Sequence, residues 1–295
     1  MDSIIEINQL TKYYGKHRGI EDVNLTIEPG EIFGFLGPNG AGKTTTIRLL
    51  LHLLKPDSGS VLLLGKSLPN NYSDILKSVG NLPGDLVLYD SLTGMEFLTF
   101  MHQLSGGKPV LQDTLLKVFE LNGTTLKKKI KYYSTGMKQK LGLIQAMQES
   151  PPLLILDEPT NGLDPLIQQV LFDQLRKFKE EGKTIFFSSH HLSEVEKLCD
   201  RVGLIRDGTL IAVEDIHALK SKMVRRMLIE TAEPLKKEFL VSDIIKIIRS
   251  ENNILELQIA GGDINPLIQK LAGVKIKNLV FPEANLEDIF LTYYE

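Results

Sequence analysis

A glycine-rich loop near the start of the chain constrains its fold more than any other feature. The segment Gly37-Pro38-Asn39-Gly40-Ala41-Gly42-Lys43-Thr44 has glycines, a lysine and a threonine at the spacing of a phosphate-binding loop. It follows the apolar run Ile32–Leu36, which is typical of a buried parallel strand, and it leads into Lys43–Leu54, where leucines recur at helical spacing. Strand, glycine loop and helix in this order predict an α/β fold built around a parallel sheet.

The same loop has the chemistry to hold a nucleoside triphosphate. Its glycines let backbone N–H groups converge on phosphate oxygens, and the following helix directs its positive end at them. Lys43 supplies a cation to the β- and γ-phosphates, and the Thr44 hydroxyl is placed for Mg²⁺. We therefore predict that Gly37–Thr44, together with the next residue, Thr45, binds ATP and Mg²⁺.

Two carboxylates follow a second apolar run. Asp157 and Glu158 come directly after Leu153–Leu156, so we expect them at the carboxyl edge of the parallel sheet, where ligands bind. Asp157 would hold Mg²⁺ directly or through water, and Glu158 would polarise the attacking water. An isolated Asp-Glu pair is more often a solvated strand end. The phosphate loop upstream and Pro159-Thr160 downstream favour the catalytic interpretation.

A third motif lies shortly before these carboxylates and reads Tyr133-Ser134-Thr135-Gly136-Met137-Lys138-Gln139-Lys140. With the phosphate loop it resembles the ATP-binding subunit of an ABC transporter, over residues 1 to about 215. The resemblance implies that Ser134 and Gly136 grip the γ-phosphate held by the opposite subunit. A plain helix cap is the alternative for Ser134. Tyr133, Thr135 and Met137 depart from the usual Leu-Ser-Gly-Gly-Gln, in a variant that looks like a branch of bacterial export ATPases of the ABC-2 type.

The resemblance also assigns roles to two later segments. Asn161-Gly162-Leu163-Asp164 matches the loop that crosses the dimer interface in this family, although Asp164 is equally suited to cap a helix. His190 matches the switch histidine that contacts the γ-phosphate, and the adjacent His191 is the competing candidate. A metal site at this histidine pair lacks companion ligands nearby in the sequence.

Two positions near the nucleotide are less settled. Tyr14 lies where the family places an aromatic ring against adenine, and Tyr13 is the competitor. Gly84 stands where the family usually has a glutamine that touches Mg²⁺ and the attacking water. Asp85 either replaces that glutamine through a water molecule or the contact is missing.

The composition of the chain limits the classes of partner that it is expected to bind. The net charge of −3 gives no electrostatic reason to expect nucleic acid, and the short run Lys127–Lys129 is read as solvated surface. The apolar runs are far shorter than the roughly 20 residues that span a bilayer, so a membrane role requires another chain. The single Cys199 fits a reducing cytoplasm.

The motifs divide the chain into two expected domains. We expect residues 1–218 to form the ATPase domain. This domain would contain a mostly parallel core sheet, an antiparallel β subdomain with a turn at Tyr13-Tyr14-Gly15, and a helical insertion over about residues 74–150. We expect residues 219–295 to form a small α+β accessory domain whose last element is a short helix at Asn285–Leu291.

The sequence thus predicts a subunit that hydrolyses ATP to drive export of an unidentified substrate through a separate transmembrane permease. One phosphate loop and one signature per chain imply a homodimer, or a heterodimer with a paralogue. The resemblance places it at the cytoplasmic face of the cell membrane as a peripheral subunit. A soluble ABC ATPase and an ATP-sensing regulatory module are the alternatives.

Overall fold

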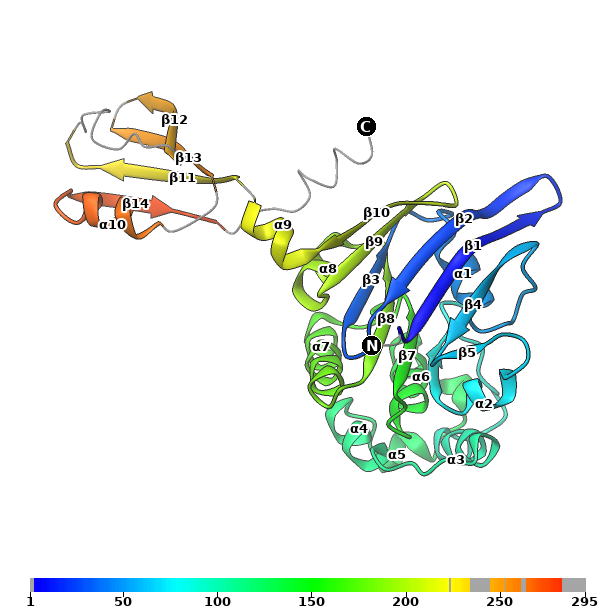
Figure 1. Cartoon of the computed structure of the whole chain (residues 1–295). Coiled ribbons are helices and arrows are strands. Elements are labelled where there is room, and N and C mark those ends of the chain that lie inside the picture. The colour runs from blue at the N-terminus through cyan, green and yellow to red at the C-terminus, as the bar shows by residue number, and fades with distance from the viewer. Residues whose placement is uncertain (1–2, 223, 234–244, 252, 261–263, 283–295) are drawn as a thin grey trace. The chain divides into compact units, whose positions relative to one another are not determined.

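The structure, a computed structural model, describes residues 3–222, 224–233, 245–251, 253–260 and 264–282 and divides into two compact units, Met1–Val213 and Glu214–Glu295 (Figure 1). The division falls five residues before the expected boundary after residue 218. The first unit contains two sheets and the second contains one, and each unit has its own hydrophobic core.

A six-stranded sheet, in the order β10-β9-β3-β8-β7-β6, forms the centre of the first unit. Neighbours from β9 to β6 run parallel, and every residue of the three central strands is buried, as expected for a sheet covered on both faces. Its strands are β3 (Ile32–Leu36), β6 (Val79–Leu82), β7 (Leu153–Asp157), β8 (Thr184–Ser189), β9 (Arg201–Arg206) and β10 (Thr209–Asp215). The last two form a hairpin: Asp207 and Gly208 both have positive φ, which is the geometry of a tight two-residue turn.

A second sheet of antiparallel strands packs over helix α1 (Lys43–Leu50). Its order is β2-β1-β4-β5, with β1 (Ile5–Tyr14), β2 (His17–Ile27), β4 (Ser58–Leu63) and β5 (Lys66–Ser67). Buried residues of α1 join apolar side chains of both sheets in one cluster. The helix that follows the phosphate loop is therefore held between the two sheets.

Two local expectations in this region are wrong. Tyr13 and Tyr14 are the last residues of the long strand β1 and not part of a turn, which is made by the residues around Gly15. The helix after the phosphate loop ends at Leu50 and not at Leu54, because the chain turns there: His52 has a φ of 51°, in the left-handed region.

Helices α3–α5 gather at one end of the first unit, beside α6 (Figure 1). The helices of this unit are α2 (Tyr72–Leu76), α3 (Gly94–Ser105), α4 (Gln112–Val118), α5 (Gly123–Leu126), the 3₁₀ turn η1 (Ile130–Tyr132), α6 (Thr135–Met147), α7 (Pro165–Glu180) and α8 (Leu192–Leu198). The expected helical stretch 74–150 also contains β6, which pairs with β7 in the parallel sheet. The helices from α3 onward thus follow a core strand.

The second unit is a four-stranded antiparallel sheet, β12-β13-β11-β14, with one helix on it. Its elements, after α9 (Ile216–Lys222), are β11 (Val224–Thr231), β12 (Ile245–Glu251), β13 (Ile254–Ala260), α10 (Asn265–Leu271) and β14 (Ile276–Val280). Alternate residues of β11 and β13 are buried with Leu267 and Leu271 of α10. The helix expected at Asn285–Leu291 lies outside the described residues.

Candidate functional site

The phosphate loop joins the buried end of β3 to the first turn of α1, and two of its glycines are required by the backbone. A Cβ on Gly37 would lie 2.3 Å from the carbonyl oxygen of Ile205 in the neighbouring strand β9. Gly42 caps α1 with a φ of 110°, a conformation that L residues with side chains rarely adopt. The loop therefore presents backbone N–H groups and the positive end of α1 at the carboxyl edge of the sheet.

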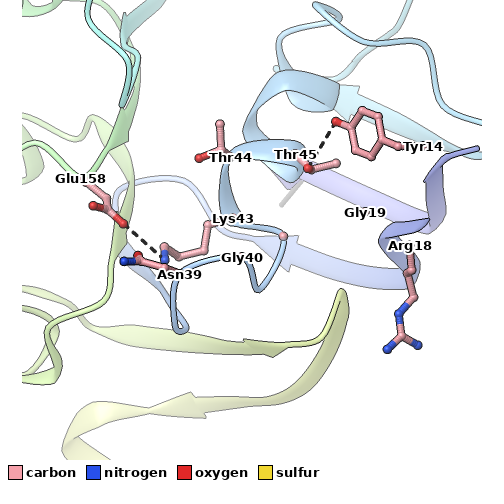
Figure 2. A pocket seen from close by; sticks show the side chains of 10 residues that line it. Tyr14, Arg18, Gly19, Asn39, Gly40, Lys43, Thr44, Thr45 and Glu158 are labelled. Carbon is pink, nitrogen blue, oxygen red and sulfur yellow. Dashed lines mark hydrogen bonds and ion pairs between the residues drawn. The ribbon is translucent and has the colours of Figure 1, made fainter.

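Lys43 supplies the positive side chain of this loop, and only 5% of its surface is exposed. Its Nζ donates to the carbonyl oxygens of Gly37 (2.7 Å) and Pro38 (3.2 Å) and lies 3.3 Å from Oε1 of Glu158. Figure 2 shows the lysine and the glutamate pointing toward each other. Phosphate oxygens that enter the loop compete with these partners for the same ammonium group.

A cavity of about 290 Å³ opens beside the loop, bounded at one end by Glu158 and at the other by Tyr14 (Figure 2). Tyr14 is 45% exposed, and its hydroxyl lies 3.4 Å from Oγ1 of Thr45. The full lining is Tyr14, Arg18, Gly19, Asn39, Gly40, Gly42, Lys43, Thr44, Thr45 and Glu158. The cavity thus brings most of the expected nucleotide contacts together.

Tyr13 has a different environment. Its hydroxyl donates to Oε1 of Glu21 at 2.6 Å, and this bond raises the pKa of Tyr13 and lowers the pKa of Glu21. Glu21 also pairs with Arg18, a residue of the cavity lining that the sequence did not single out. Of the two tyrosines, Tyr14 is the one whose side chain lines the cavity.

The two oxygen donors expected for Mg²⁺ meet directly. The Thr44 hydroxyl donates to Oδ2 of Asp157 at 2.8 Å, and the carboxylate itself is buried at the end of β7. An alcohol and a carboxylate are hard oxygen ligands of the kind that Mg²⁺ takes beside phosphate oxygens and water. Within the residues that the structure describes, no group of three or more His, Cys, Asp or Glu side chains is placed to hold a metal.

Glu158 has an unusual backbone and a densely bonded carboxylate. Its φ is 48°, the left-handed region that non-glycine residues seldom occupy. Oε1 faces both Lys43 and Nδ1 of His190 (3.2 Å), and Oε2 accepts from the Asn161 amide (2.8 Å). Burial alone raises the pKa of Glu158. The Asn161 bond, the Lys43 charge and His190 outweigh it, so the pKa is lowered and the side chain is a carboxylate at neutral pH.

The two histidines differ in what they contact. His190 reaches the Glu158 carboxylate, whereas the backbone N–H of His191 donates to Oγ of Ser189 as the chain enters α8. Their rings lie 3.9 Å apart, centroid to centroid. The geometry therefore associates His190, and not its neighbour, with the carboxylate at the cavity.

Ser134, Gly136 and Asp164 belong to two loops, here called the second cluster, and the described lining of the cavity includes none of them. Ser134 caps α6 by accepting from the N–H of Met137 (3.2 Å), which was the alternative for this residue, and Asp164 caps α7 by accepting from two N–H groups. A Cβ on Gly136 would lie 2.8 Å from the carbonyl oxygen of Gly162, so the two loops pack closely. The N-terminal end of α6 thus lies beside the loop 161–164.

The loop that follows β6 lies against the carboxylate of Asp157. A Cβ on Gly84 would lie 3.0 Å from Oδ2 of Asp157. The side chain of Asp85, the other candidate in this loop, is 89% exposed and pairs with Arg48 of α1 at 3.5 Å. The backbone of Gly84 is therefore a part of this loop that lies beside Asp157.

Comparisons with known proteins agree with this geometry. Residues 20–161 match the ABC transporter family. The chain is 36% identical to the bacitracin transport ATP-binding protein BcrA of Bacillus licheniformis, over 99% of this chain and 97% of that protein. It is 35% identical to the uncharacterized ABC transporter ATP-binding protein YhcH of Bacillus subtilis (99% and 96%), and 31% identical to the linearmycin resistance ATP-binding protein LnrL of the same species (98% and 97%).

Solved structures show the same fold. The ATP-binding subunit of an ABC transporter superimposes with a TM-score of 0.69 and 30% identity, covering 74% of this chain and 92% of that one. A bacterial ABC transporter cassette solved as a dimer has a TM-score of 0.65 at 24% identity, with 72% and 98% covered. Among the described residues, no helix is both long enough and apolar enough to cross a membrane.

Proposed function

The chain belongs to the ABC transporter family of ATP-binding proteins, and on this premise we propose that it is the ATP-hydrolysing subunit of an exporter whose membrane-spanning part is a separate permease. The observation that carries the proposal is the convergence of Lys43, Asp157, Glu158 and His190 at one edge of the parallel sheet. Relatives named for bacitracin transport and linearmycin resistance support export as the direction. The permease selects the cargo.

Each residue of the cavity has a distinct part in this proposal. Lys43 and the N-terminal end of α1 bind the phosphates, and Thr44 and Asp157 hold Mg²⁺, which neutralises charge on the β- and γ-phosphate oxygens when it is bound. Glu158 accepts a proton from the attacking water, for which its ionised form is required. His190 is held by the same carboxylate and contacts the γ-phosphate.

The second cluster serves the nucleotide of another subunit. Ser134 caps α6 and Gly136 lies in its first turn, so both are at the positive end of this helix, which is a suitable environment for a phosphate. Their separation from the cavity lining within this chain supports their use in a dimer, as a homodimer or with a paralogue. We place the assembly at the cytoplasmic face of the membrane, held there by the permease, with residues 219–295 as an accessory domain.

An exposed apolar patch on the helical end supports a permease contact. Tyr89 and Phe100 meet edge to face, with ring centroids 5.7 Å apart, although each is more than a third exposed. Leu104, one helical turn from Phe100 in α3, and Val87, two residues before Tyr89, are 65% and 88% exposed, and we count them with this patch. Large exposed apolar groups that adjoin one another are typical of protein contact surfaces. We propose that the permease docks on this patch of four residues.

Placing charge in the patch should release the chain from membranes. The double variant Tyr89→Glu/Phe100→Glu is expected to lower the fraction of full-length chain that sediments with host-cell membranes by about tenfold or more, because aromatic anchors of an interface contribute about 2 kcal/mol or more. ATP hydrolysis by the isolated chain should remain. Val110→Glu, at another exposed apolar residue, is the matched control and should stay with the membranes. Full retention of the double variant would contradict the docking site, and absence of the wild type from membranes would contradict the proposed function itself.

Removing the aromatic face of Tyr14 should weaken nucleotide binding. We expect Tyr14→Ala to raise the Kd for ATP about tenfold, since stacking of a base on an aromatic ring contributes about 1–3 kcal/mol. Tyr14→Phe keeps the flat face and should bind as the wild type does, which separates stacking from the hydroxyl contact with Thr45. Fluorescent ATP titrations measure both. If Tyr13→Ala weakened binding and Tyr14→Ala did not, the assignment to Tyr14 would be wrong.

A further inference from the structure

Ser188 connects the two catalytic carboxylates, although neither the motifs nor the resemblance assigns it a role. It is fully buried at the end of β8, the strand that lies between β3 and β7 in the sheet. Its register partner in β7 is Asp157, and residues paired in a parallel sheet point to the same face. The hydroxyl of Ser188 is therefore directed along the sheet edge toward the Asp157 carboxylate.

The Ser188 hydroxyl makes two hydrogen bonds, one as a donor and one as an acceptor. It donates its proton to Oδ1 of Asp157 at 2.5 Å, and it accepts from the backbone N–H of Glu158 at 3.0 Å. The same N–H also lies 3.2 Å from the Ser188 carbonyl oxygen. A hydroxyl can donate one hydrogen bond and can also accept through its lone pairs, and the Ser188 hydroxyl does both.

The two bonds act on different properties of the site. The bond to Oδ1 fixes the rotation of the Asp157 carboxylate so that Oδ2 faces Thr44. The bond from the Glu158 N–H holds a residue whose left-handed backbone is intrinsically unfavourable, and that backbone directs its carboxylate toward His190 and Lys43. One hydroxyl thus holds the expected metal carboxylate and the expected general base.

We infer that Ser188 is a positioning residue for ATP hydrolysis, which sets the orientation of Asp157 and the backbone conformation of Glu158. This inference rests on the proposed roles of these two carboxylates. Ser188 touches neither the phosphates nor the water and acts through its neighbours. Removing its hydroxyl leaves a buried carboxylate oxygen of Asp157 without the serine donor and a strained Glu158 backbone with less support.

Ser188→Ala tests this in single-turnover hydrolysis with the full-length chain in excess over ATP. The rate at saturating chain concentration should fall about 10- to 100-fold, as for loss of a hydrogen bond to a charged group. The Kd for ATP without Mg²⁺ should change little, whereas the Mg²⁺ concentration at half-maximal rate should rise. Ser188→Thr, which retains the hydroxyl, should recover most of the rate.

The control is Thr184→Val at the other end of the same strand. It removes an equally buried hydroxyl, which accepts from the N–H of Gly30 far from the carboxylates. It should lower the midpoint of thermal unfolding as Ser188→Ala does, without the change in Mg²⁺ dependence. If Ser188→Ala does not fold, the comparison becomes Ser188→Cys, a weak donor of similar shape, against Ser188→Thr.

The outcomes separate the inference from the proposed function. Wild-type rate and Mg²⁺ dependence in Ser188→Ala, or equal rates for the Cys and Thr variants, would overturn the positioning role. If Glu158→Gln abolishes hydrolysis in the same assay, the proposed function is supported even where Ser188→Ala contradicts the positioning role. If Glu158→Gln hydrolyses normally, the assignment of the base fails, and the Mg²⁺ titration of Ser188→Ala still tests the orientation of Asp157.

Discussion

Replacing Glu158 by glutamine should lower the rate of ATP hydrolysis by on the order of 10²- to 10⁴-fold while ATP binding persists, because positioned proton transfer contributes about that much. Glutamine keeps the size of the side chain and can still interact with Asn161 and His190. It cannot accept the proton of the attacking water. Phosphate release and ATP titration on the same protein measure the two effects separately.

The same variant should trap two subunits around ATP. If Ser134 and Gly136 grip nucleotide held by a second chain, then size exclusion of Glu158→Gln should show a monomer without nucleotide and a dimer with ATP and Mg²⁺. Glu149→Gln is the matched control, since that carboxylate pairs with His102 away from the cavity, and it should hydrolyse ATP at the wild-type rate. Normal hydrolysis by Glu158→Gln would refute the assignment of Glu158 as the general base. A monomer under both conditions would contradict nucleotide sharing in the isolated chain.

The parts of the fold with strong local signals were predictable. The buried strand Ile32–Leu36 has the expected ends, because its apolar run closes on a glycine loop. Asp164 caps a helix, as its residue type allows, and this helix has a proline in its first turn. Glycine loops and caps act over a few residues. Their effect can therefore be read without knowing what the segment packs against.

Features that depend on distant residues were not predictable in this way. The strand Val79–Leu82 falls within the stretch expected to be helical, because its partner strand in the sheet begins only at Leu153. The sequence also gives no sign that Asp85 pairs with Arg48, which lies on another element. Ser188 carried a weak signal, a hydroxyl at the end of an apolar strand. Its importance follows from register with Asp157, which no local pattern specifies.

Loss of the Lys43 charge should abolish tight ATP binding. We expect Lys43→Met to raise the Kd for ATP by about 10- to 100-fold or more, because each hydrogen bond to a charged group contributes about 1.5–3 kcal/mol and the ammonium serves two phosphates. Methionine retains the length of the buried stem. Lys12→Met is the control, since Lys12 is also paired, to Asp57, but does not line the cavity. It should bind ATP normally, and wild-type affinity in Lys43→Met would refute the phosphate role.

Lys43→Met should also change how stability depends on pH, in a direction set by Glu158. The Lys43 charge is one of the groups that lower the pKa of Glu158, so its removal should raise that pKa. A carboxylate with a lowered folded-state pKa stabilises the fold above its unfolded pKa, and this stabilisation is lost as the pH falls through the folded value. The variant should therefore lose less of its thermal midpoint than the wild type between about pH 7 and pH 3.5, a range that spans ordinary carboxyl pKa values. An unchanged or steeper acid loss would show that Lys43 does not hold Glu158 ionised.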